Sequence, residues 1–543
     1  MAFNLADLFE RVADAVGERE AIVSAGVRQT YRDLDRRAAG LAAAMGAAGL
    51  GPGHSVALAL GNRVECVEVV LAAFKAGAVP VNLNRQFVLE ELRAVLDDAR
   101  PSLVVADPER AELVGLAAGP SCQVWSPGAA HEARATGPAQ PRRERSGDDE
   151  YIIYTSGTSG RPRGVVWRHE DLFFAALGGG NLGGAPIGSP AEIVAHVAPH
   201  PGRTLIASPL THGTAQWAAL AALLGGNTLL LSGTPGFDAE VVLDLAAGER
   251  ASHLVLVGDA YAIPLLEALD AHPGRWDLDG LVVVASGGAP LSSDGAARLL
   301  EHLPGALVSD GYGSSESGGQ GRRVLVPGSV GGSLPAFQMS SDTRVVDEEW
   351  RELTPGSDQV GQIVRVGRVP LRYTADRPGD RAAFATRAGE RWVLTDDLGR
   401  VEADGTVTLL GRRARVINTG GEKVHPAEVE AVLRTHPGVR DVVVVGVADL
   451  RFGEAVAAVV EAVRGESPAR LERDALRAHC RPMLAPFKLP RSVVVVDRLD
   501  RLASGKIDVA AARARAEEAG AARGDEPAAG PDAAPAAPAS PSE

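Results

Sequence analysis

The feature that most constrains the fold is a regular alternation of helix-like and strand-like segments along the chain. Residues 34–45 carry apolar side chains at helical spacing, residues 55–60 read as a buried strand, and residues 64–76 are again helical. A strand-like run follows at 79–83, and later ones lie at 203–208, 253–257 and 281–285. This alternation predicts an α/β fold with layered sheets.

The length of the chain predicts more than one domain, because 543 residues exceed what a single hydrophobic core usually supports. We predict a large multi-sheet N-terminal domain over residues 1–411, a connector over 412–416 and a small α+β domain over 417–515. The Ala/Pro-rich remainder, 516–543, is predicted to be a disordered tail, since it offers little apolar surface to bury. The unpatterned stretch 121–147 is predicted to be a surface loop.

Charge and cysteine content exclude several classes of partner. The formal net charge is −14, and no long basic stripe offsets it, so we expect no nucleic acid partner. Cys66, Cys122 and Cys480 show neither disulfide nor zinc spacing, which favours a reducing compartment. The first residues lack a secretion signal, and no apolar run is long enough to span a membrane. We therefore expect a cytoplasmic protein.

A hydroxyl- and glycine-rich loop at residues 155–164 directly follows the β-prone run 150–154. Glycines bring backbone N–H groups close to an anion, hydroxyls add donors, and arginines neutralise charge, so the loop predicts polyphosphate binding. It is not the common NTPase loop, because its glycines are followed by Arg-Pro-Arg where that loop requires Gly-Lys-Ser/Thr. The loop begins with Thr155, Ser156, Gly157, Thr158, Ser159 and Gly160.

Further motifs follow in order: Ser-Pro-Leu-Thr-His-Gly at 208–213, Ser-Gly-Gly-Ala-Pro at 286–290, Asp-Gly-Tyr-Gly-Ser-Ser-Glu at 310–316, and Thr-Asp-Asp at 395–397. Gly-Arg-Arg-Ala-Arg at 411–415, Gly-Gly-Glu-Lys-Val-His-Pro at 420–426 and Ser-Gly-Lys-Ile at 504–507 complete the series. In this order the chain resembles the acyl-adenylate-forming superfamily, over about residues 5–510. The resemblance implies an acid–thiol ligase that uses ATP, Mg²⁺ and coenzyme A and forms an acyl-AMP intermediate.

The resemblance also implies roles for single residues in the nucleotide site. Glu316 would assist Mg²⁺, and Asp397 would accept hydrogen bonds from the ribose, with Arg412 beside it. Tyr312 would lie against the adenine base. The rest of the adenine slot would be formed by Gly288, Ala289, Pro290, Asp310, Gly311, Gly313 and Ser314.

The small C-terminal domain is implied to be mobile. Lys506 would stabilise the adenylation transition state, and rotation about a hinge at Arg415 would then replace it with Gly420 and Gly421. Glycines suit a narrow passage for the pantetheine thiol because any Cβ would intrude.

His212 would stand as a gate near the substrate carboxylate. No acid follows it in residues 213–218, where an amino-acid substrate would require an aspartate for its ammonium group. The resemblance is greatest to actinobacterial ligases of fatty and steroid acids, which implies a bulky lipophilic acid as substrate. The identity of that acid, the pathway and the oligomeric state stay open, a homodimer being one candidate.

Three departures from the family pattern keep alternatives open. Arg161 and Arg163 replace the usual lysines, Arg415 replaces the usual hinge residue, and Asp396 adds a carboxylate next to Asp397. An inward-pointing Asp396 would weaken ATP binding, whereas an outward one would do nothing. The alternatives are an enzyme that mainly converts preformed acyl-AMP to the thioester, a nucleotide-binding protein without catalysis, and a ligase that loads a carrier protein.

Overall fold

The computed structural model describes residues 2–120, 122–129, 145–155, 162–181, 183–234, 236–329, 334–375, 383–419, 422–449, 452–463, 468–502 and 505–522. The chain divides into two compact units. The first comprises Met1–Ala414 together with the short segment Ala503–Lys506, and the second comprises Arg415–Leu502 and Ile507–Glu543. The predicted domain boundaries and the hinge stay predictions.

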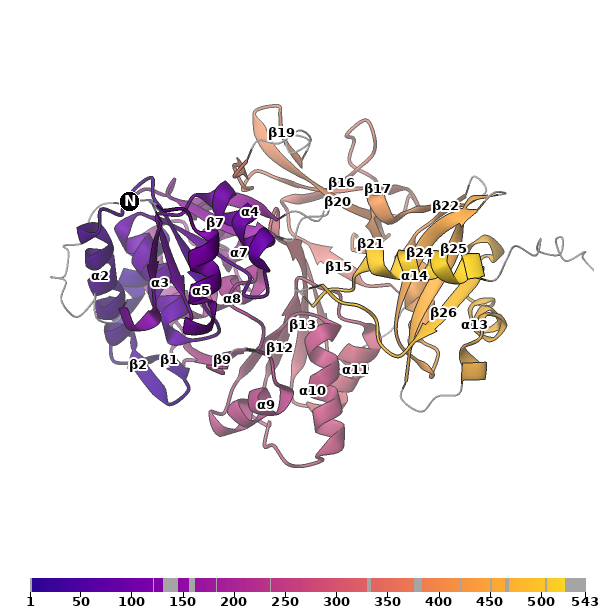
Figure 1. Ribbon diagram of the computed structural model, residues 1–543, viewed down its shortest axis with the longest axis horizontal. Helices are drawn as coiled ribbons and strands as arrows, with labels where there is room; N and C mark the ends of the chain where they lie inside the picture. Colours follow the sequence, from indigo (N-terminus) through magenta and orange to yellow (C-terminus); the bar gives the residue numbers. More distant parts are fainter. Residues whose placement is uncertain are drawn as a thin grey trace, which may run out of the picture. The chain divides into compact units, whose positions relative to one another are not determined.

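The largest sheet of the first unit is mixed, with a parallel part and an antiparallel part (Figure 1). Its parallel part contains β12 (Val283–Gly287), β11 (His253–Leu256), β9 (Arg203–Ile206), β10 (Thr228–Leu231) and β1 (Glu20–Ser24), with β2 (Val27–Thr30) at the edge. Its other end contains β13 (Leu307–Ser314), β14 (Gly318–Leu325), β15 (Ala336–Met339), β21 (Val407–Arg412), β20 (Glu390–Val401), β17 (Val360–Val366), β16 (Thr343–Val346) and β19 (Phe384–Arg387).

A second sheet of the same unit carries the phosphate-loop strands. Its order is β18 (Arg372–Tyr373), β8 (Arg163–Arg168), β7 (Glu150–Thr155), β4 (Val79–Asn82), β3 (Ser55–Ala59), β5 (Leu103–Ala106) and β6 (Gln123–Trp125). The helices of this unit are α1 (Leu5–Ala15), α2 (Tyr31–Ala47), α3 (Val64–Ala76), α4 (Leu89–Ala99), α5 (Pro108–Ala117), α7 (His169–Ala176), α8 (Gly213–Leu224), α9 (Ala239–Gly248), α10 (Asp259–Ala271) and α11 (Ser293–His302).

Strand alternation assigns the two faces of each sheet to different cores. Val56 and Leu58 of β3 join a core shared with α1, α3 and α8, whereas Ala57 and Ala59 join the core beneath α4 and α5. On the large sheet, Leu229 and Leu231 of β10 enter that same shared core, and the intervening Leu230 packs with α9–α11. Helices α1, α3 and α8 therefore lie between the two sheets, which explains why α3 and α8 are apolar on nearly all sides.

Local chemistry sets several helix ends. The Thr30 side chain accepts from the backbone N–H of Asp33, and the Asp33 carboxylate accepts in return from that of Thr30, forming a capping box at the start of α2. Helix α3 ends at Gly77, which adopts a left-handed conformation with φ of 71°.

The second unit is a small sheet covered by helices. Its strands are β22 (Ile417–Thr419), β23 (Glu422–Val424), β24 (Val439–Asp449), β25 (Gly453–Ala462) and β26 (Ser492–Val496), and its helices are α12 (Pro426–Arg434), α13 (Arg473–Cys480) and α14 (Val509–Ala522). Helix α12 begins with Pro426, which lacks the N–H that a first-turn residue leaves unpaired. One face of the β24–β25 pair packs on α12 and α13, and the other packs on α14.

The predicted α/β class and most predicted elements are confirmed. The helix expected at 64–76 is α3, and the strands expected at 55–60, 203–208 and 253–257 are β3, β9 and β11, each slightly shorter than predicted. The strand expected at 281–285 is β12, which begins two residues later than predicted, at Val283.

Two predictions of irregular structure, the loop at 121–147 and the start of the tail at 516, are wrong in part. The stretch 121–147 contains the short strand β6, which pairs in parallel with β5, so it is not loop throughout. Helix α14 continues to Ala522, beyond residue 516 where the tail was predicted to begin. Its alanines favour helix, and Ala512 and Ala516 are buried against the sheet, which composition alone did not reveal.

None of the helices in the described part of the chain has both the length and the apolar composition that a bilayer crossing requires.

Candidate active site

The phosphate-loop sequence joins two antiparallel strands of the first unit. Thr155 is the last residue of β7 and pairs with Arg163, the first residue of β8. The hydroxyl oxygen of Thr155 is buried and has no hydrogen-bond partner among the described residues, so it is available to a ligand. The remaining predicted phosphate contacts, at Ser156, Gly157, Thr158, Ser159 and Gly160, lie outside the described residues, as does Arg161.

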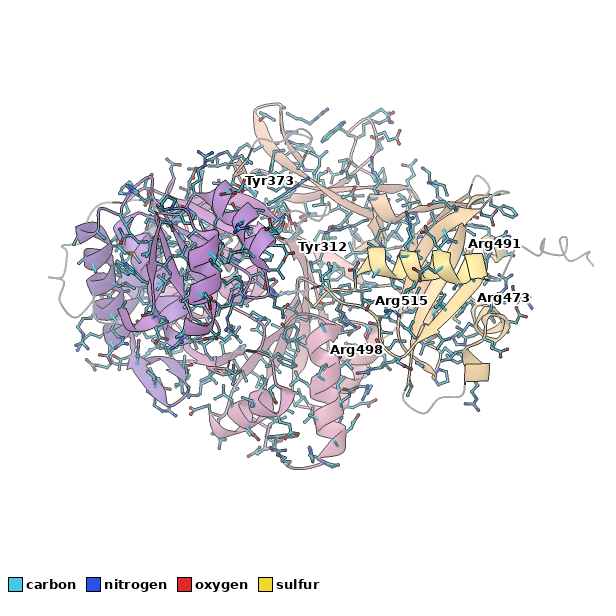
Figure 2. The ribbon with its side chains drawn as sticks, in the orientation of Figure 1. Tyr312, Tyr373, Arg473, Arg491, Arg498 and Arg515 are labelled. Atoms are coloured by element: carbon cyan, nitrogen blue, oxygen red, sulfur yellow. The ribbon has the colours of Figure 1, made fainter. Side chains whose placement is uncertain are left out.

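Glu316 lies in the turn between β13 and β14. Its backbone N–H donates to the Ser314 hydroxyl at 3.2 Å, and its Oε1 accepts from the Tyr373 hydroxyl at 3.4 Å. The Arg163 guanidinium carbon lies 5.3 Å from the centroid of the same Tyr373 ring. Tyr373, labelled in Figure 2 with Tyr312, therefore connects the second phosphate-loop strand to Glu316. Sequence reasoning did not single out Tyr373.

The carboxyl ends of β12 and β13 meet at one edge of the sheet, as parallel strands must. Gly287 pairs with Gly311, and the chain then turns through Gly288, whose φ is +80°. A Cβ at Gly288 would lie 2.6 Å from the Thr214 hydroxyl of α8, so a glycine is needed there. Such an edge is where ligands bind in open α/β sheets. Ala289 and Pro290 follow Gly288, and the Pro290 carbonyl accepts from the Asp259 N–H at 3.0 Å.

Asp310 differs from its neighbours because its carboxylate is already engaged. It accepts from the Arg323 Nε at 2.7 Å, and Arg323 also donates to the Leu291 carbonyl at 2.8 Å. Burial nevertheless raises the pKa of Asp310 to about 6, against the opposing effect of Arg323. The side chain of Asp310 therefore holds the loop after Pro290 in place through Arg323.

Tyr312 and Asp397 form a buried hydrogen bond between β13 and β20. The Tyr312 hydroxyl donates to Asp397 Oδ2 at 2.8 Å, and burial together with this carboxylate raises the pKa of Tyr312 well above its usual range. Arg412, the cross-strand partner of Asp397 on β21, approaches Asp397 Oδ1 at 3.6 Å through its Nε. The predicted ribose acceptor, its arginine and the predicted base-contacting tyrosine are thus neighbours.

Asp396 points away from this group. Its side chain is exposed, and its Oδ2 accepts from the backbone N–H of Ala414 at 3.3 Å. Successive side chains of a strand face opposite sides, so an inward Asp397 requires an outward Asp396. This is the orientation in which no effect on ATP was expected.

Lys506 belongs to the first unit and meets the same charged group. The residue Lys506 is exposed by surface area, yet the protein atoms packed around it and the Arg412 charge lower its pKa from 10.5, while the Glu316 and Asp397 carboxylates raise it. Those two carboxylates favour the charged ammonium. The structure therefore brings together Lys506, Glu316, Asp397 and Arg412, which are far apart in sequence.

His212 precedes α8 as its N-cap residue. Burial, aided by the Lys506 charge, lowers its pKa to about 4, so its imidazole is neutral at physiological pH. A neutral imidazole can donate a hydrogen bond to a carboxylate without adding a net charge to the site.

Two buried asparagines, which sequence reasoning missed, hold the segment before His212. The Asn82 amide donates to the Thr211 carbonyl, and its Oδ1 accepts from the Tyr154 N–H at 3.2 Å, next to the phosphate loop. Asn62 accepts from the Leu210 N–H at 2.7 Å and donates to the Ser208 carbonyl at 2.8 Å. The available signal is a polar residue at or shortly after the end of an apolar strand, Asn82 as the last residue of β4 and Asn62 three residues beyond β3. Asn82 thus links the predicted phosphate and carboxylate sites.

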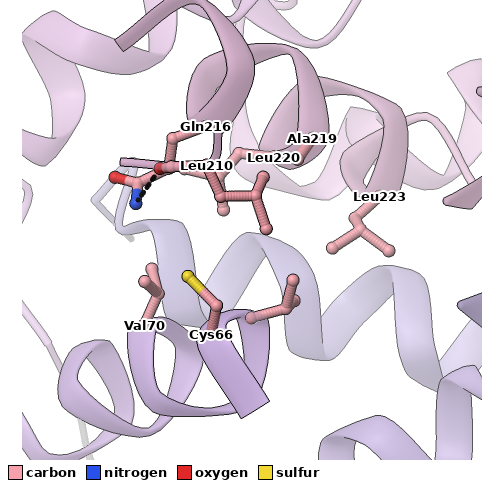
Figure 3. A pocket seen from close by; sticks show the side chains of 8 residues that line it. Cys66, Val70, Leu210, Gln216, Ala219, Leu220 and Leu223 are labelled. Carbon is pink, nitrogen blue, oxygen red and sulfur yellow. Dashed lines mark hydrogen bonds between the residues drawn. The ribbon is translucent and has the colours of Figure 1, made fainter. Parts of the chain in front are cut away.

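A small apolar pocket lies beneath this segment, between α3 and α8 (Figure 3). It is lined by Cys66, Val67, Val70, Leu210, Gln216, Ala219, Leu220 and Leu223. The Gln216 amide that borders it donates to the Leu210 carbonyl at 3.2 Å, and burial raises the pKa of the Cys66 thiol to about 12. Because that thiol stays protonated, the pocket offers packing space and no nucleophile.

The predicted hinge residue, Arg415, is bound within the second unit. Its guanidinium donates to Glu430 Oε1 of α12 at 2.7 Å and to the Val444 carbonyl of β24 at 3.1 Å. Gly420 and Gly421, the predicted thiol passage, lie outside the described residues.

Comparison with known proteins finds relatives that match nearly the whole chain. Residues 9–369 match the family model for the AMP-binding enzyme, and residues 428–506 match that for the AMP-binding enzyme C-terminal domain. The chain is 36% identical to 3-oxocholest-4-en-26-oate–CoA ligase of Rhodococcus rhodochrous, covering 94% of this chain and 95% of that one. It is 37% identical to medium/long-chain-fatty-acid–CoA/3-oxocholest-4-en-26-oate–CoA ligase of Mycolicibacterium smegmatis, with coverage of 95% and 97%.

Among solved structures, ATP-bound MatB from Rhodopseudomonas palustris superposes with a TM-score of 0.78. The sequence identity is 29%, and the match covers 94% of this chain and 98% of that one.

The fold and the family comparisons together define an enzyme of the adenylate-forming class. The chain belongs to the family of AMP-binding enzymes. The resemblance, the fold class and the enzyme class predicted from the sequence, an acid–CoA ligase, are thereby confirmed.

Proposed function

We propose that the chain activates a bulky lipophilic carboxylic acid, fatty or steroid-like, as its acyl-AMP and transfers the acyl group to coenzyme A. The observation that carries this proposal is the convergence of Lys506, Glu316, Asp397 and Arg412, which lie far apart in sequence. The names of the two ligases compared above support the substrate class. A cytoplasmic location and a homodimer remain predictions.

In the first half-reaction, a carboxylate oxygen of the acid attacks the α-phosphorus of ATP. The new O–P bond forms as the bond to the bridging oxygen of pyrophosphate breaks, and pyrophosphate leaves. Negative charge develops on oxygens around the α-phosphorus, and the Lys506 ammonium would stabilise it.

The described residues fit a magnesium ion that would accompany ATP. Mg²⁺ prefers hard oxygen ligands and is usually held by one or two carboxylates together with phosphates and water. Glu316 would supply the carboxylate, and the unpartnered Thr155 hydroxyl lies at the predicted phosphate loop. The bound ion would neutralise charge on the β- and γ-phosphates.

Asp397 and Tyr312 would orient the nucleotide. Asp397 has one oxygen bound by the Tyr312 hydroxyl, which leaves lone pairs to accept from the ribose hydroxyls. The Tyr312 ring would lie along the adenine, with its hydroxyl fixed by the carboxylate. This coupling means that a change to either residue would disturb both contacts.

His212 would orient the acid. Its neutral imidazole would donate to one carboxylate oxygen, leaving the other free to attack. No aspartate follows it in residues 213–218 to pair a substrate ammonium, which favours an acid without an amino group.

In the second half-reaction, the thiolate of coenzyme A attacks the acyl carbon, the C–S bond forms, and AMP leaves. We propose that the second unit reorients before this step, so that Gly420 and Gly421 line the path of the thiol. Because the Arg415 side chain is tied to α12 and β24, the bend would lie just before it, at Arg413 and Ala414.

Mass spectrometry of products would test the function directly. The purified chain is incubated with ATP, Mg²⁺, coenzyme A and a pool of fatty, steroid and terpenoid acids, and acyl-CoA thioesters are expected together with AMP. The Lys506→Ala variant is the matched control and should form far less of each product. Absence of every thioester with the unmodified chain would contradict the proposal.

The alternative of a thioester-forming enzyme with weak adenylation rests on the extra carboxylate of Asp396. Because that side chain is exposed, it supplies no repulsion toward the nucleotide. Comparing pyrophosphate exchange with thioester formation from synthetic acyl-AMP separates the two functions, and we expect both activities.

A further inference from the structure

Gln320 is a buried amide that the mechanism above does not use. It lies on β14, four residues after Glu316, and its side chain is 0% exposed. Neither its amide nitrogen nor its amide oxygen has a hydrogen-bond partner among the described residues. Buried side-chain amides are normally paired, so an unpaired one requires an explanation.

The strand around Gln320 is firmly held. Its backbone carbonyl accepts from the Ser340 N–H at 2.8 Å and from the Thr343 hydroxyl at 3.1 Å. The side chain is therefore not left unpaired by disorder of its own backbone.

A β-bulge determines which way Gln320 points. Gly321 pairs with Tyr312 and Gly319 pairs with Gly313, so Gln320 is the extra residue between them. Tyr312 packs toward Phe337, with 5.8 Å between ring centroids, and a Cβ on Gly321 would also meet Phe337, at 3.2 Å. Along its other edge β14 pairs with β15 without a register shift, Gly321 with Met339 and Arg322 with Gln338, and the Gln320 carbonyl accepts from the next residue, Ser340. Side chains alternate along this regularly paired part, so Gln320 faces the side opposite Gly321. Gln320 thus lies on the other face of the sheet, with Gly313.

That other face is the one on which the acid is expected. Gly287, Gly311 and Gly313 lie along it, and none of them contributes a side chain. A Cβ on Gly287 would lie 3.6 Å from the Thr214 methyl group, in the first turn of α8 just after His212. Gln320 and His212, the proposed carboxylate gate, therefore lie on the same face of the sheet, on which these three glycines present no side chains.

We propose that Gln320 determines specificity by hydrogen-bonding a neutral oxygen function on the lipophilic part of the acid. Its Nε2 would donate to a ketone, or its Oε1 would accept from a hydroxyl. This inference rests on the proposed function and narrows it to lipophilic acids that carry such an oxygen remote from the carboxylate. A purely hydrocarbon chain cannot make this hydrogen bond, so an acid that carries the oxygen binds more tightly by the contribution of that bond.

The test compares two acids that differ only in the remote oxygen, 3-oxocholest-4-en-26-oic acid and its 3-deoxy counterpart. Gln320→Met keeps the approximate side-chain size and removes the amide. Gln338→Met makes the same change at an exposed position of β15 and serves as the matched control.

We expect the unmodified chain to prefer the oxo acid in kcat/KM. Gln320→Met should lower kcat/KM for the oxo acid by about 10- to 100-fold and leave the deoxy acid unchanged or improved. Gln338→Met should change neither. A series of palmitic acids bearing one hydroxyl at successive positions would then show at what distance from the carboxylate Gln320 recognises an oxygen.

Failure of this inference is distinguishable from failure of the proposed function. Equal kcat/KM for the two acids, or an unchanged ratio in Gln320→Met, overturns the role of Gln320 while thioester formation still stands. If neither acid nor any member of the palmitate series gives a thioester, the proposed function itself fails.

Thermal unfolding without substrate gives an independent readout. Replacing an unpaired buried amide by an apolar side chain should raise the Tm of Gln320→Met above that of the unmodified chain. A Tm well below that of Gln338→Met would show that the amide has a structural partner, which would overturn the proposal.

Discussion

Asp396 and Asp397 are neighbours on β20, with the same side chain and the same formal charge, yet they meet different surroundings. Asp397 is bound by the Tyr312 hydroxyl and approached by Arg412, and its charge also acts on Lys506. Asp396 is exposed and accepts a 3.3 Å hydrogen bond from the Ala414 backbone. One step along a strand thus separates a carboxylate with partners from remote segments from one that faces solvent.

The difference lies in partners contributed by remote segments. Tyr312 comes from β13, Arg412 from β21 and Lys506 from the segment 503–506, and all of them converge on the inward face. The comparison predicts that changes on this face alter adenylation, whereas changes on the outward face do not.

Loss of the inward cation should have the largest effect. Lys506→Ala should slow acyl-AMP formation by about 10²–10³-fold, because it removes an electrostatic stabiliser of the transition state. Pyrophosphate exchange in the absence of coenzyme A measures this step alone. Lys423→Ala, at an exposed lysine of β23, should exchange pyrophosphate normally. Near-normal exchange in Lys506→Ala would refute its role.

Neutralising the inward carboxylate should have the next largest effect. Asp397→Asn keeps the shape and removes the charge that pairs with Arg412 and Lys506. Hydrogen bonds to charged groups contribute about 1.5–3 kcal/mol, which corresponds to about 10- to 100-fold in kcat/KM for ATP. Steady-state kinetics at varied ATP concentration measure this loss. An unchanged kcat/KM would place Asp397 outside the nucleotide site.

The pH dependence should distinguish the two carboxylates as well. The protein atoms packed around Lys506 lower its pKa below 10.5. The ammonium is therefore lost at a lower pH than in an ordinary lysine, and above that pH adenylation should fall about tenfold per pH unit. Asp397 opposes that lowering, so Asp397→Asn should move the alkaline limb to still lower pH.

Asp396→Asn should leave the alkaline limb in place. His212, with a pKa of about 4, should add no inflection between pH 6 and 8. These profiles require pyrophosphate exchange at saturating ATP. Coincident limbs for Asp397→Asn and the unmodified chain would contradict the assigned contact.

Removing the Tyr312 hydroxyl tests how far Asp397 depends on its partner. Tyr312→Phe leaves the ring against Phe337 and deletes one hydrogen bond, so we expect a 2- to 10-fold loss in kcat/KM for ATP. Tyr261→Phe on α10, which packs on Phe237, is the control and should retain full activity. A loss as large as that of Asp397→Asn would mean that Asp397 is misplaced without the hydroxyl.

The sequence predicted features that depend on local pattern and could not predict those that depend on remote partners. Residues 64–76 were predicted to be a helix because their apolar spacing is helical, and α3 has those bounds. The sequence does not show which of Asp396 and Asp397 faces inward, because both are aspartates. The register of β20 against β21, which decides it, is set by contacts outside the motif.

Asn82 and Gln320 were missed for the same reason. The importance of Asn82 comes from its bonds to Thr211 and Tyr154, residues distant in sequence, and that of Gln320 comes from a bulge and a missing partner. Neither residue type is unusual by itself in a buried strand.

The smallest expected effect is the sharpest test of the comparison. Asp396→Asn removes a charge from the outward face. There the Asp396 carboxylate accepts a 3.3 Å hydrogen bond from the backbone N–H of Ala414, an exposed residue. Surface substitutions of this kind change little, so KM for ATP and the rate of pyrophosphate exchange should stay within about twofold of the unmodified values. A several-fold fall in KM for ATP would mean that Asp396 repels the nucleotide during turnover. That result would revive the enzyme with weak adenylation, because the repulsion would then act in a conformation in which β20 presents both carboxylates to the site.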